Sequence, residues 1–310
     1  MFNKNALSLN RTGRFALPCK AVFAPNTQLQ IYCAHTMEKK RSYQELMGRF
    51  EDIARRVGAR MSPVGDFTCP LGDYSIYQIL LETGKAQQNI VISAGMHGDE
   101  PASCEALLKT IELIEGRRDR LNAQFLIFPC DNPTGWELDT RENYLGLDLN
   151  REFAKENQAV EIALVEQALR GREIHFTLDL HEDIDVYGMY LYERIRKGKI
   201  PLAEEMIKAL RHRGYPIHEE DWIEGLPATG GIIWPSGRLR KFELPKAVYL
   251  WHSGVGHLIT TESPGKLDLT TRVEMQLVCV EVFLDALEQE RFLPAVGTPA
   301  NPDTAANPAV

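Results

Sequence analysis

Hydrophobic and polar positions switch between helical and strand-like spacing along most of the chain. Apolar residues from Leu46 to Val57 recur at helical spacing between Ser42, a favourable N-cap, and Gly58. Similar patterns predict further helices over 101–116, 157–171, 201–214 and 269–289. Short alternating or wholly apolar runs predict strands over 74–84, 88–95, 124–133, 174–183, 246–251 and 257–262.

Strands that alternate with helices of about ten to fifteen residues indicate crossover connections and a largely parallel sheet with helices on both faces. The short spacing of "MYLYE", "AVYLW" and "HLITT" also predicts some antiparallel pairing. No internal repeat and no Pro/Gly-rich linker interrupts residues 42–291. We therefore expect a single α/β domain with a mixed, mainly parallel, twisted sheet.

The two ends of the chain differ in composition from this domain. Residues 1–36 contain four basic residues and no Asp or Glu. A basic targeting arm or tether fits this composition, and so does a loosely held extension or a segment upstream of a true start at Met37. We favour the extension, which we expect to span residues 1–41. The tail 292–310 is rich in Pro, Ala and Asn and is expected to be disordered.

The composition limits the classes of protein and partner to be considered. A formal net charge of −8 argues against nucleic acid or an anionic membrane as the main partner. No apolar stretch reaches the length of a transmembrane helix. The six cysteines show no short paired spacing, which is typical of reduced thiols in a cytoplasmic protein. The sequence leaves the oligomeric state open.

Four side chains suited to metal chemistry lie at the ends of predicted strands: His97, Glu100, His181 and Glu262. Because the carboxyl ends of parallel strands meet at one edge of a sheet, we expect these side chains to lie together. Two imidazoles and a carboxylate suit a catalytic Zn²⁺ site with one position open for water. For His97 and Glu100 alone, a capping turn with a buried, hydrogen-bonded histidine is the alternative.

The segment "DNPTGWELDTRENYLGLDLNREF" carries Arg141, Asp148, Asn150 and Arg151 close together. The planar guanidinium group of arginine matches a carboxylate in two parallel hydrogen bonds. Two arginines and an asparagine beside a metal would form a receptor for a substrate carboxylate and its reacting carbonyl. A solvated loop with incidental charge is the alternative.

Taken together, the motifs between residues 70 and 290 resemble those of the zinc carboxypeptidase superfamily, which also contains succinylglutamate desuccinylase and aspartoacylase. The matching motifs are, in order, His97-x-x-Glu100, Asn132-Pro133-x-Gly135, Arg141, Asp148-x-Asn150-Arg151, His181 and Glu262. The "NPTGW" and "LDLNREF" segments are most similar to the compact bacterial branch that includes murein peptide amidases, and the short gap from Glu100 to His181 resembles both that branch and the deacylases.

The resemblance implies one zinc ion per chain, held by His97, Glu100 and His181. It implies that Glu262 acts as a general base, which takes a proton from the attacking water and delivers it to the leaving amine. It also implies that Asp148 contacts His97 from behind and orients its ring.

For the substrate, the resemblance implies that Arg141 stabilises the oxyanion and that Asn150 and Arg151 bind a terminal carboxylate. One position departs from the pancreatic enzymes, in which an arginine lies between the histidine and glutamate ligands. That position holds Asp99 in this chain. Tyr249 lies near the position of an active-site tyrosine, but its spacing to Glu262 is too short for that role to be transferred.

We therefore expect a zinc-dependent hydrolase that cleaves an amide bond next to a terminal carboxylate, in a peptide or murein peptide. An N-acyl amino acid deacylase of the desuccinylase type is the first alternative, and an inactive, metal-free binding protein is the second. The acidic run of Glu182, Asp183 and Asp185 would bind a positively charged substrate group or form a solvated loop. The Gly-rich segment 228–237 would form a lid or a pocket wall.

Overall fold

The computed structural model describes residues 38–235 and 244–292. The helices are α1 (Tyr43–Arg56), α2 (Pro101–Gly116), α3 (Pro133–Leu138), α4 (Val160–Leu169), α5 (Ala203–His212), α6 (Lys246–His252) and α7 (Leu269–Glu288). The strands are β1 (Arg60–Cys69), β2 (Gly72–Glu82), β3 (Gln88–Ser93), β4 (Ala123–Phe128), β5 (Phe176–Asp183), β6 (Tyr190–Ile195), β7 (Trp222–Ile223), β8 (Leu226–Thr229), β9 (Ile232–Ile233) and β10 (His257–Pro264). The 3₁₀ helices η2 (Arg118–Arg120) and η3 (Leu149–Arg151) lie in connecting loops.

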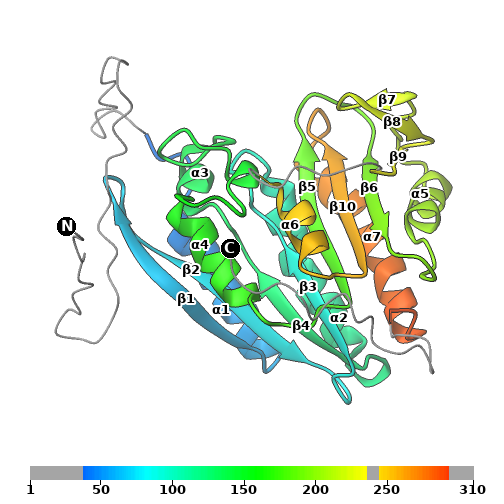
Figure 1. Cartoon of the computed structure of the whole chain (residues 1–310), viewed down its shortest axis with the longest axis horizontal. Coiled ribbons are helices and arrows are strands. Elements are labelled where there is room, and N and C mark those ends of the chain that lie inside the picture. Colours follow the sequence, from blue (N-terminus) through cyan, green and yellow to red (C-terminus); the bar gives the residue numbers. More distant parts are fainter. Residues whose placement is uncertain (1–37, 236–243, 293–310) are drawn as a thin grey trace, which may run out of the picture.

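The described strands form one mixed sheet in the order β1-β2-β4-β3-β5-β10-β6-β9-β8-β7 (Figure 1). The central strands β4, β3, β5 and β10 run parallel to one another. Antiparallel pairs flank them, formed by β1, β2 and β4 on one side and by β10 and β6 on the other. The carboxyl ends of β3, β5 and β10 therefore meet at one edge of the sheet, which is where open α/β sheets bind their ligands.

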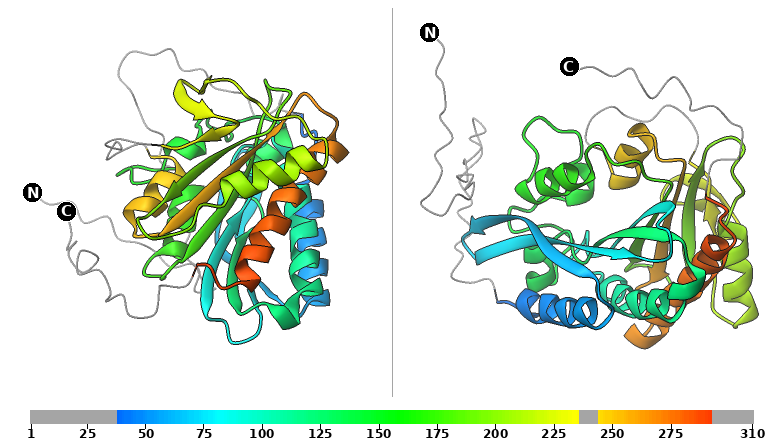
Figure 2. Two further views of the ribbon diagram at one scale, coloured as in Figure 1. Left: turned by 90° about the vertical axis from the view of Figure 1, so that its right-hand side faces the viewer. Right: turned by 90° about the horizontal axis from the view of Figure 1, so that it is seen from below.

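Helices cover both faces of the sheet (Figure 2). On one face α2 packs against α1 and α7, and α5 packs against α7. On the other face α4 contacts β1 and β2, and α6 contacts β10. Because the central strands are covered on both sides, their sequences are almost continuously apolar rather than alternating.

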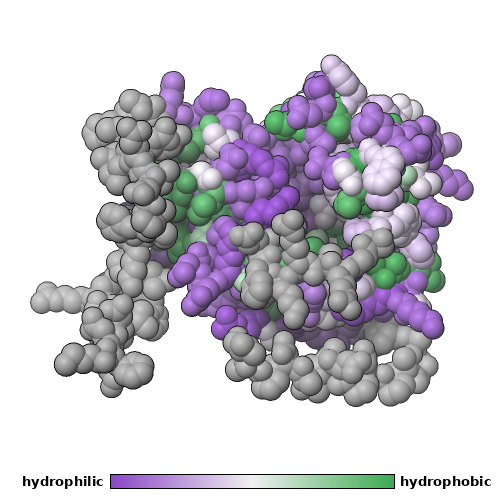
Figure 3. Space-filling view, turned by 45° about the horizontal axis from the view of Figure 1, so that its top comes forward, coloured by the Kyte–Doolittle hydropathy of each residue, from purple (hydrophilic) through white to green (hydrophobic). Residues whose placement is uncertain are grey.

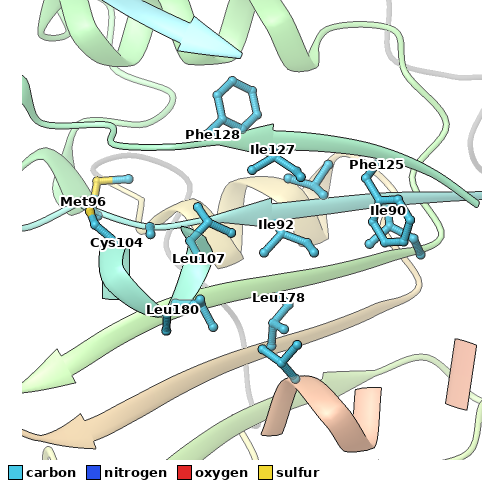
Figure 4. Close-up of a cluster of buried hydrophobic side chains, with 14 of the residues drawn as sticks. Ile90, Ile92, Met96, Cys104, Leu107, Phe125, Ile127, Phe128, Leu178 and Leu180 are labelled. Carbon is cyan, nitrogen blue, oxygen red and sulfur yellow. The ribbon is translucent and has the colours of Figure 1, made fainter. Parts of the chain in front are cut away.

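The apolar core lies between the central strands and α2 (Figure 4). Ile90 and Ile92 of β3 and Leu178 and Leu180 of β5 are all buried, and Leu107 of α2 packs among them. Close packing on both sides of β3 and β5 leaves these strands little freedom to move. The loops that follow them are therefore held on a rigid support.

Most of the predicted elements agree with the structure. The helix predicted over 101–116 is α2 with the same limits. Ser42 caps α1 as expected, because its hydroxyl oxygen accepts a hydrogen bond from the backbone N–H of Glu45 at 3.1 Å. The predicted class, a single α/β domain with a mixed sheet and helices on both faces, is confirmed.

The strand predicted over 246–251 is wrong, because this segment forms helix α6. Lys246 and Leu250, four residues apart, are both buried, as expected for one face of a helix. The run Ala247–Trp251 contains no polar residue that would distinguish this spacing from a strand. The sequence analysis also did not predict β1, α3 or the short strands β7, β8 and β9.

Contacts with the folded domain begin before residue 42. The backbone N–H groups of Lys40 and Arg41 donate to the carbonyl oxygen of Glu137 at 2.7 and 3.3 Å. The Arg41 guanidinium also lies over the Trp136 ring, 4.3 Å from its centroid. The predicted extension 1–41 thus includes residues that pack on the domain. Its remainder, residues 1–37, and the predicted tail from residue 293 onward lie outside the described residues.

Candidate metal centre

Three predicted ligands converge where the central strands end. His97 and Glu100 lie between β3 and α2, and His181 lies in β5. Their exposures are only 3%, 2% and 2%. Glu262 of β10 is the Cα partner of His181 in the parallel β5–β10 pair, so the two side chains leave the same face of the sheet.

Two glycines shape the turn that carries His97. Gly95 has a φ of +65°, and a Cβ atom there would lie 2.8 Å from Cys130 Sγ and 2.9 Å from Cys104 Sγ. A Cβ atom on Gly98 would lie 1.9 Å from the backbone carbon of Gly135. Gly98 therefore makes room for the neighbouring backbone of α3. The turn is fixed against α3, which limits the positions open to His97.

Glu100 contacts both histidines. Its Oε1 lies 2.5 Å from His97 Nδ1, and its Oε2 lies 2.9 Å from His181 Nδ1. The two imidazole rings are 5.1 Å apart between centroids. One donor atom from each of the three residues falls within 4.8 Å of the other two. Two imidazole nitrogens and a carboxylate oxygen in this arrangement match the His₂Glu donor set of catalytic zinc sites.

A carboxylate contacts the far nitrogen of each imidazole. His97 Nε2 lies 3.2 Å from Asp148 Oδ1, and His181 Nε2 lies 3.3 Å from Asp179 Oδ2. Such carboxylates fix the ring orientation and the tautomer of histidines that bind metals. The contact of Asp148 is the one that the resemblance implied. Asp179 was missed, although Asp-x-His within a strand places both side chains on one face.

Glu100 and Glu262 differ in the direction in which their surroundings shift the pKa of the carboxyl group. Burial opposes ionisation of Glu100, but the charges of His97 and His181 outweigh it and lower its pKa to about 2. Burial raises the pKa of Glu262 to about 8; His181 opposes this shift, and Glu100 adds to it. Burial disfavours the charged form of His181, yet Glu100 and Asp179 leave its pKa well above the usual value. Glu262 is thus able to exchange a proton near neutral pH, as a general base requires.

Arg141 lies beside the ligands, with a side chain that is 42% exposed. Its Nη1 is 3.3 Å from His97 Nδ1 and 3.8 Å from Glu100 Oε1. Its Nη2 donates to Asp148 Oδ2 at 3.1 Å. In the space-filling view of Figure 3, hydrophilic residues gather in the middle of the face that includes this edge of the sheet. A positive group that is open to solvent beside the ligands can reach an incoming carbonyl oxygen.

Asn150 and Arg151 lie in η3, next to Asp148. Asn150 Oδ1 accepts a hydrogen bond from the backbone N–H of Lys246 at 2.9 Å, which fixes its amide group. Arg151 is exposed, and its guanidinium donates to the carbonyl oxygen of Asn150 at 2.8 Å. The structure thus brings Asn150 and Arg151 to the loop beside the ligands, but within the described part of the chain their side chains hydrogen-bond to backbone groups rather than to a histidine or to Glu100.

In the acidic run after His181, Glu182 and Asp183 have different partners. Glu182 is 3% exposed, and its carboxylate accepts from the backbone N–H of Ala102 at 2.5 Å and from Arg272 Nη1 at 2.5 Å. It is thus neither a solvated residue nor available to a substrate. Asp183 accepts a hydrogen bond from the Tyr190 hydroxyl at 3.0 Å.

Tyr249 and the Gly-rich segment also have defined places. The Tyr249 ring packs against Phe153, with centroids 5.3 Å apart, so nothing in its contacts supports an active-site role. Residues 228–233 comprise the end of β8, the turn that follows it and β9, which lie beyond β6 in the sheet. The last residues of the predicted lid, 236 and 237, lie outside the described residues.

Comparison with known proteins agrees with this geometry. A model of the succinylglutamate desuccinylase/aspartoacylase catalytic domain matches residues 86–220. The fold is similar to that of a protein provisionally named a metallopeptidase from Shewanella baltica OS155 (TM-score 0.67, 23% identity, covering 79% of this chain and 92% of that chain). It is also similar to metallo-carboxypeptidases from Burkholderia cenocepacia (0.61, 15%, 81% and 70%) and Pseudomonas aeruginosa (0.55, 17%, 78% and 69%). A search of curated protein sequences finds no significant match.

The α/β fold with its mixed sheet is similar to that of the metallo-carboxypeptidases. The family model matches residues 86–220, which is less than half of the chain, and the similar solved structures show the fold that the chain shares with them. The matched catalytic-domain segment contains His97, Glu100 and His181 but ends before Glu262. At identities below 25% the solved structures share the fold with this chain, and the substrate has to be inferred from the site.

Proposed function

We propose that this protein is a zinc-dependent hydrolase with one zinc ion per chain, which cleaves an amide bond next to a terminal carboxylate. The observation that carries the proposal is the convergence of two imidazole Nδ1 atoms on Glu100, with Glu262 on the adjacent strand. Both imidazoles have a carboxylate behind them, which is the usual support of a metal-binding histidine.

The chain's own residues supply the proton transfer. When bound, zinc contributes Lewis-acid polarisation of the scissile carbonyl and activation of a water molecule. A carboxylate oxygen of Glu262 takes the proton of the attacking water and then delivers it to the nitrogen of the leaving amine. The raised pKa of Glu262, about 8 before a metal binds, supports this role because the group can hold the proton between the two steps.

Arg141 stabilises the negative charge that develops on the carbonyl oxygen of the substrate. Its guanidinium lies beside both His97 and Glu100, and it donates to the carbonyl oxygen as that oxygen becomes negative. Asn150 and Arg151 bind the terminal carboxylate. The Nδ2 group of Asn150 is the donor for this purpose, because Oδ1 already accepts from Lys246.

Two substrate classes fit this chemistry. The metallopeptidase and metallo-carboxypeptidase names of the similar structures support a peptide, including a murein peptide. The match to the succinylglutamate desuccinylase/aspartoacylase model supports an N-acyl amino acid. Both reactions break an amide bond by the same proton transfers, so the two classes differ only in the group beyond the acyl carbon. We place the peptide first and the N-acyl amino acid second.

A substrate panel separates the two classes. Zinc-loaded protein is incubated with C-terminal peptides, murein tripeptide, N-succinylglutamate and N-acetylaspartate, and the released amine is measured. Release of the terminal residue from peptides supports the first class, and turnover of N-acyl amino acids alone would replace it with the second. An inactive binding protein predicts no turnover and less than about a tenth of an equivalent of zinc after gentle purification.

We further propose that the protein acts in the cytoplasm on small molecules rather than on nucleic acid or membranes. None of the described helices is both long and apolar enough to cross a membrane. Among the described cysteines, Cys104, Cys130 and Cys279 are buried free thiols, which suits a reducing compartment. Fractionation of cells that express the tagged protein tests this proposal.

A further inference from the structure

A buried charge cluster lies behind the metal centre. Lys246, the first residue of α6, is 0% exposed, and its Nζ lies 2.6 Å from Asp131 Oδ2 and 3.9 Å from Asp179 Oδ1. Asp131 is also 0% exposed, and Asp179 is 6% exposed. The hydroxyl of Ser93 donates to Asp179 Oδ1 at 2.6 Å. One ammonium group thus faces two buried carboxylates that come from different segments of the chain.

Such a cluster is a poor way to stabilise a core. Removing charges from water is expensive, and apolar residues of similar size often serve equally well. The cluster is also imperfectly satisfied, because Asp131 Oδ1 has no hydrogen-bond partner among the described residues. A role other than stability accounts better for a lysine at this position.

Asp179 connects the cluster to the metal centre. Its Oδ1 faces Ser93 and Lys246, while its Oδ2 lies 3.3 Å from His181 Nε2. The opposite ring nitrogen of His181, Nδ1, faces Glu100. An imidazole that donates from Nε2 to a fixed carboxylate presents Nδ1 as the free electron pair for a metal. The position of the Asp179 carboxylate therefore decides which nitrogen of His181 faces the site.

Lys246 also reaches the substrate side of the site. Its backbone N–H donates to Asn150 Oδ1 at 2.9 Å, while its side chain extends to the two aspartates. One residue at the start of α6 thus holds both the support of a metal ligand and the amide proposed to bind the substrate carboxylate.

We propose that Lys246 is a positioning residue of the metal centre: it holds the Asp179 carboxylate as its counter-charge, and Asp179 in turn orients His181 so that Nδ1 faces the metal. This inference rests on the metal site of the proposed function. It assigns to Lys246 no contact with the metal or with the substrate.

The test uses the double variant Lys246→Met with Asp131→Asn. Both changes preserve the approximate side-chain volume, and together they remove the ion pair without leaving Asp131 as an unpaired buried anion. Zinc affinity is measured on the full-length protein by competition with a chromophoric chelator. We expect it to fall about 10–100-fold, as for other partners that stand behind metal ligands.

The matched control is Leu250→Ala. Leu250 is 2% exposed in the same helix, so its truncation weakens the packing of α6 without altering the charge cluster. Thermal unfolding of both proteins shows how far each is destabilised. We expect Leu250→Ala to keep the zinc affinity of the unmodified protein at a comparable loss of stability.

A second measurement tests the route through Asp179. We expect Asp179→Asn alone to weaken zinc binding by a similar factor, and the Lys246→Met and Asp131→Asn changes to add little on that background. Imidazole ¹⁵N spectra of the metal-free proteins, recorded at a pH high enough to deprotonate His181, should show that the neutral ring loses its preference for the Nε2–H tautomer in both variants.

The outcomes are distinct. Zinc affinity that is unchanged in the double variant, or that falls equally in Leu250→Ala, overturns the role of Lys246 and leaves the metal centre intact. Additive losses on the Asp179→Asn background would show that Lys246 does not act through Asp179. Failure of the unmodified protein to bind zinc would overturn both this inference and the proposed function.

Discussion

Two of the described glutamates, Glu193 and Glu100, are buried against histidines, and only Glu100 belongs to a candidate metal centre. His257 Nε2 lies 2.6 Å from Glu193 Oε1 across the β10–β6 pair, and both side chains are 1% exposed. Glu100 makes comparable contacts with His97 and His181. A buried histidine beside a glutamate is therefore no sign of metal binding by itself.

The difference lies in what each glutamate already binds. Glu193 also accepts hydrogen bonds from the backbone N–H groups of Leu202 and Ala203 at the start of α5, at 2.7 and 3.3 Å. The His257 ring packs edge-on against Phe176, with centroids 4.8 Å apart. The Glu193 carboxylate and the His257 ring are thus fully occupied by protein groups. Glu100 instead contacts a second imidazole, that of His181, and lies next to the partly exposed Arg141. A site needs converging donors and an approach from solvent.

The largest expected effect separates the two glutamates of the β10–β6 region, Glu262 and Glu193. Glu262→Gln removes the proposed base, so kcat should fall about 10²–10⁴-fold while zinc content is retained. Glu193→Gln makes the same chemical change in the contact with His257 and should lower the thermal unfolding temperature with little effect on kcat. Steady-state kinetics and metal analysis of both variants test this. Equal kcat values for the two would remove Glu262 from the mechanism.

The second comparison is between His181→Gln and His257→Gln. His181→Gln should weaken zinc binding at least about 100-fold, because a ligand is lost rather than a supporting partner. His257→Gln should keep zinc affinity and lower the free energy of unfolding by about 1–3 kcal/mol, because it disturbs a buried hydrogen bond. Chelator competition and denaturant titration measure these quantities. Retention of zinc in His181→Gln contradicts the proposed ligand set.

A third variant, Asp148→Asn, sharpens the comparison by changing a group behind a ligand. Zinc affinity should fall about 10–100-fold, because Asp148 contacts both His97 and Arg141. Asp139→Asn is the control, because Asp139 is 40% exposed and its ion pairs with Lys40 and Arg41 lie at the surface. If the two variants bind zinc equally well, Asp148 has no supporting role.

The smallest expected effect is the change in zinc affinity that accompanies a change of one pH unit. Burial lowers the pKa of both rings, but Glu100 outweighs it together with Asp148 at His97 and with Asp179 at His181, so the pKa of each histidine is raised. Protons on these rings compete with the metal, so zinc affinity should fall as the pH falls, by about tenfold per pH unit for each proton displaced. Glu100, with a pKa of about 2, stays ionised over this range. A zinc affinity independent of pH between 5 and 8 would contradict ligation by these histidines.

The sequence predicted that His97, Glu100 and His181 lie close together, because the signals for their proximity are local or topological. His97 and Glu100 are three positions apart in the sequence, and Gly95 and Gly98 lie beside them. His181 lies near the end of a predicted strand, and the edge rule for parallel sheets brings such ends together. The structure places all three side chains in contact.

The support behind the centre could not be predicted in the same way. Lys246 and Asp131 are 115 positions apart, and no spacing rule connects them. The segment that carries Lys246 was predicted as a strand, in which Lys246 and Leu250 would also share a face. Glu182 was read as part of an acidic loop, although packing buries it against Arg272. Each of these outcomes depends on which elements pack together.

The sequence by itself determined the class of fold and the residues suited to bind a metal. Both can be recognised in short segments, from the hydrophobic periodicity and from the types of residue that follow each predicted strand. Only the tertiary structure decided that Glu193 is fully occupied by protein groups while Glu100 is next to a partly exposed arginine. It also decided that the buried Lys246 lies behind His181, with Asp179 between them. The physical reason is that burial and hydrogen-bond saturation are properties of packed neighbours, and those neighbours come from distant parts of the chain.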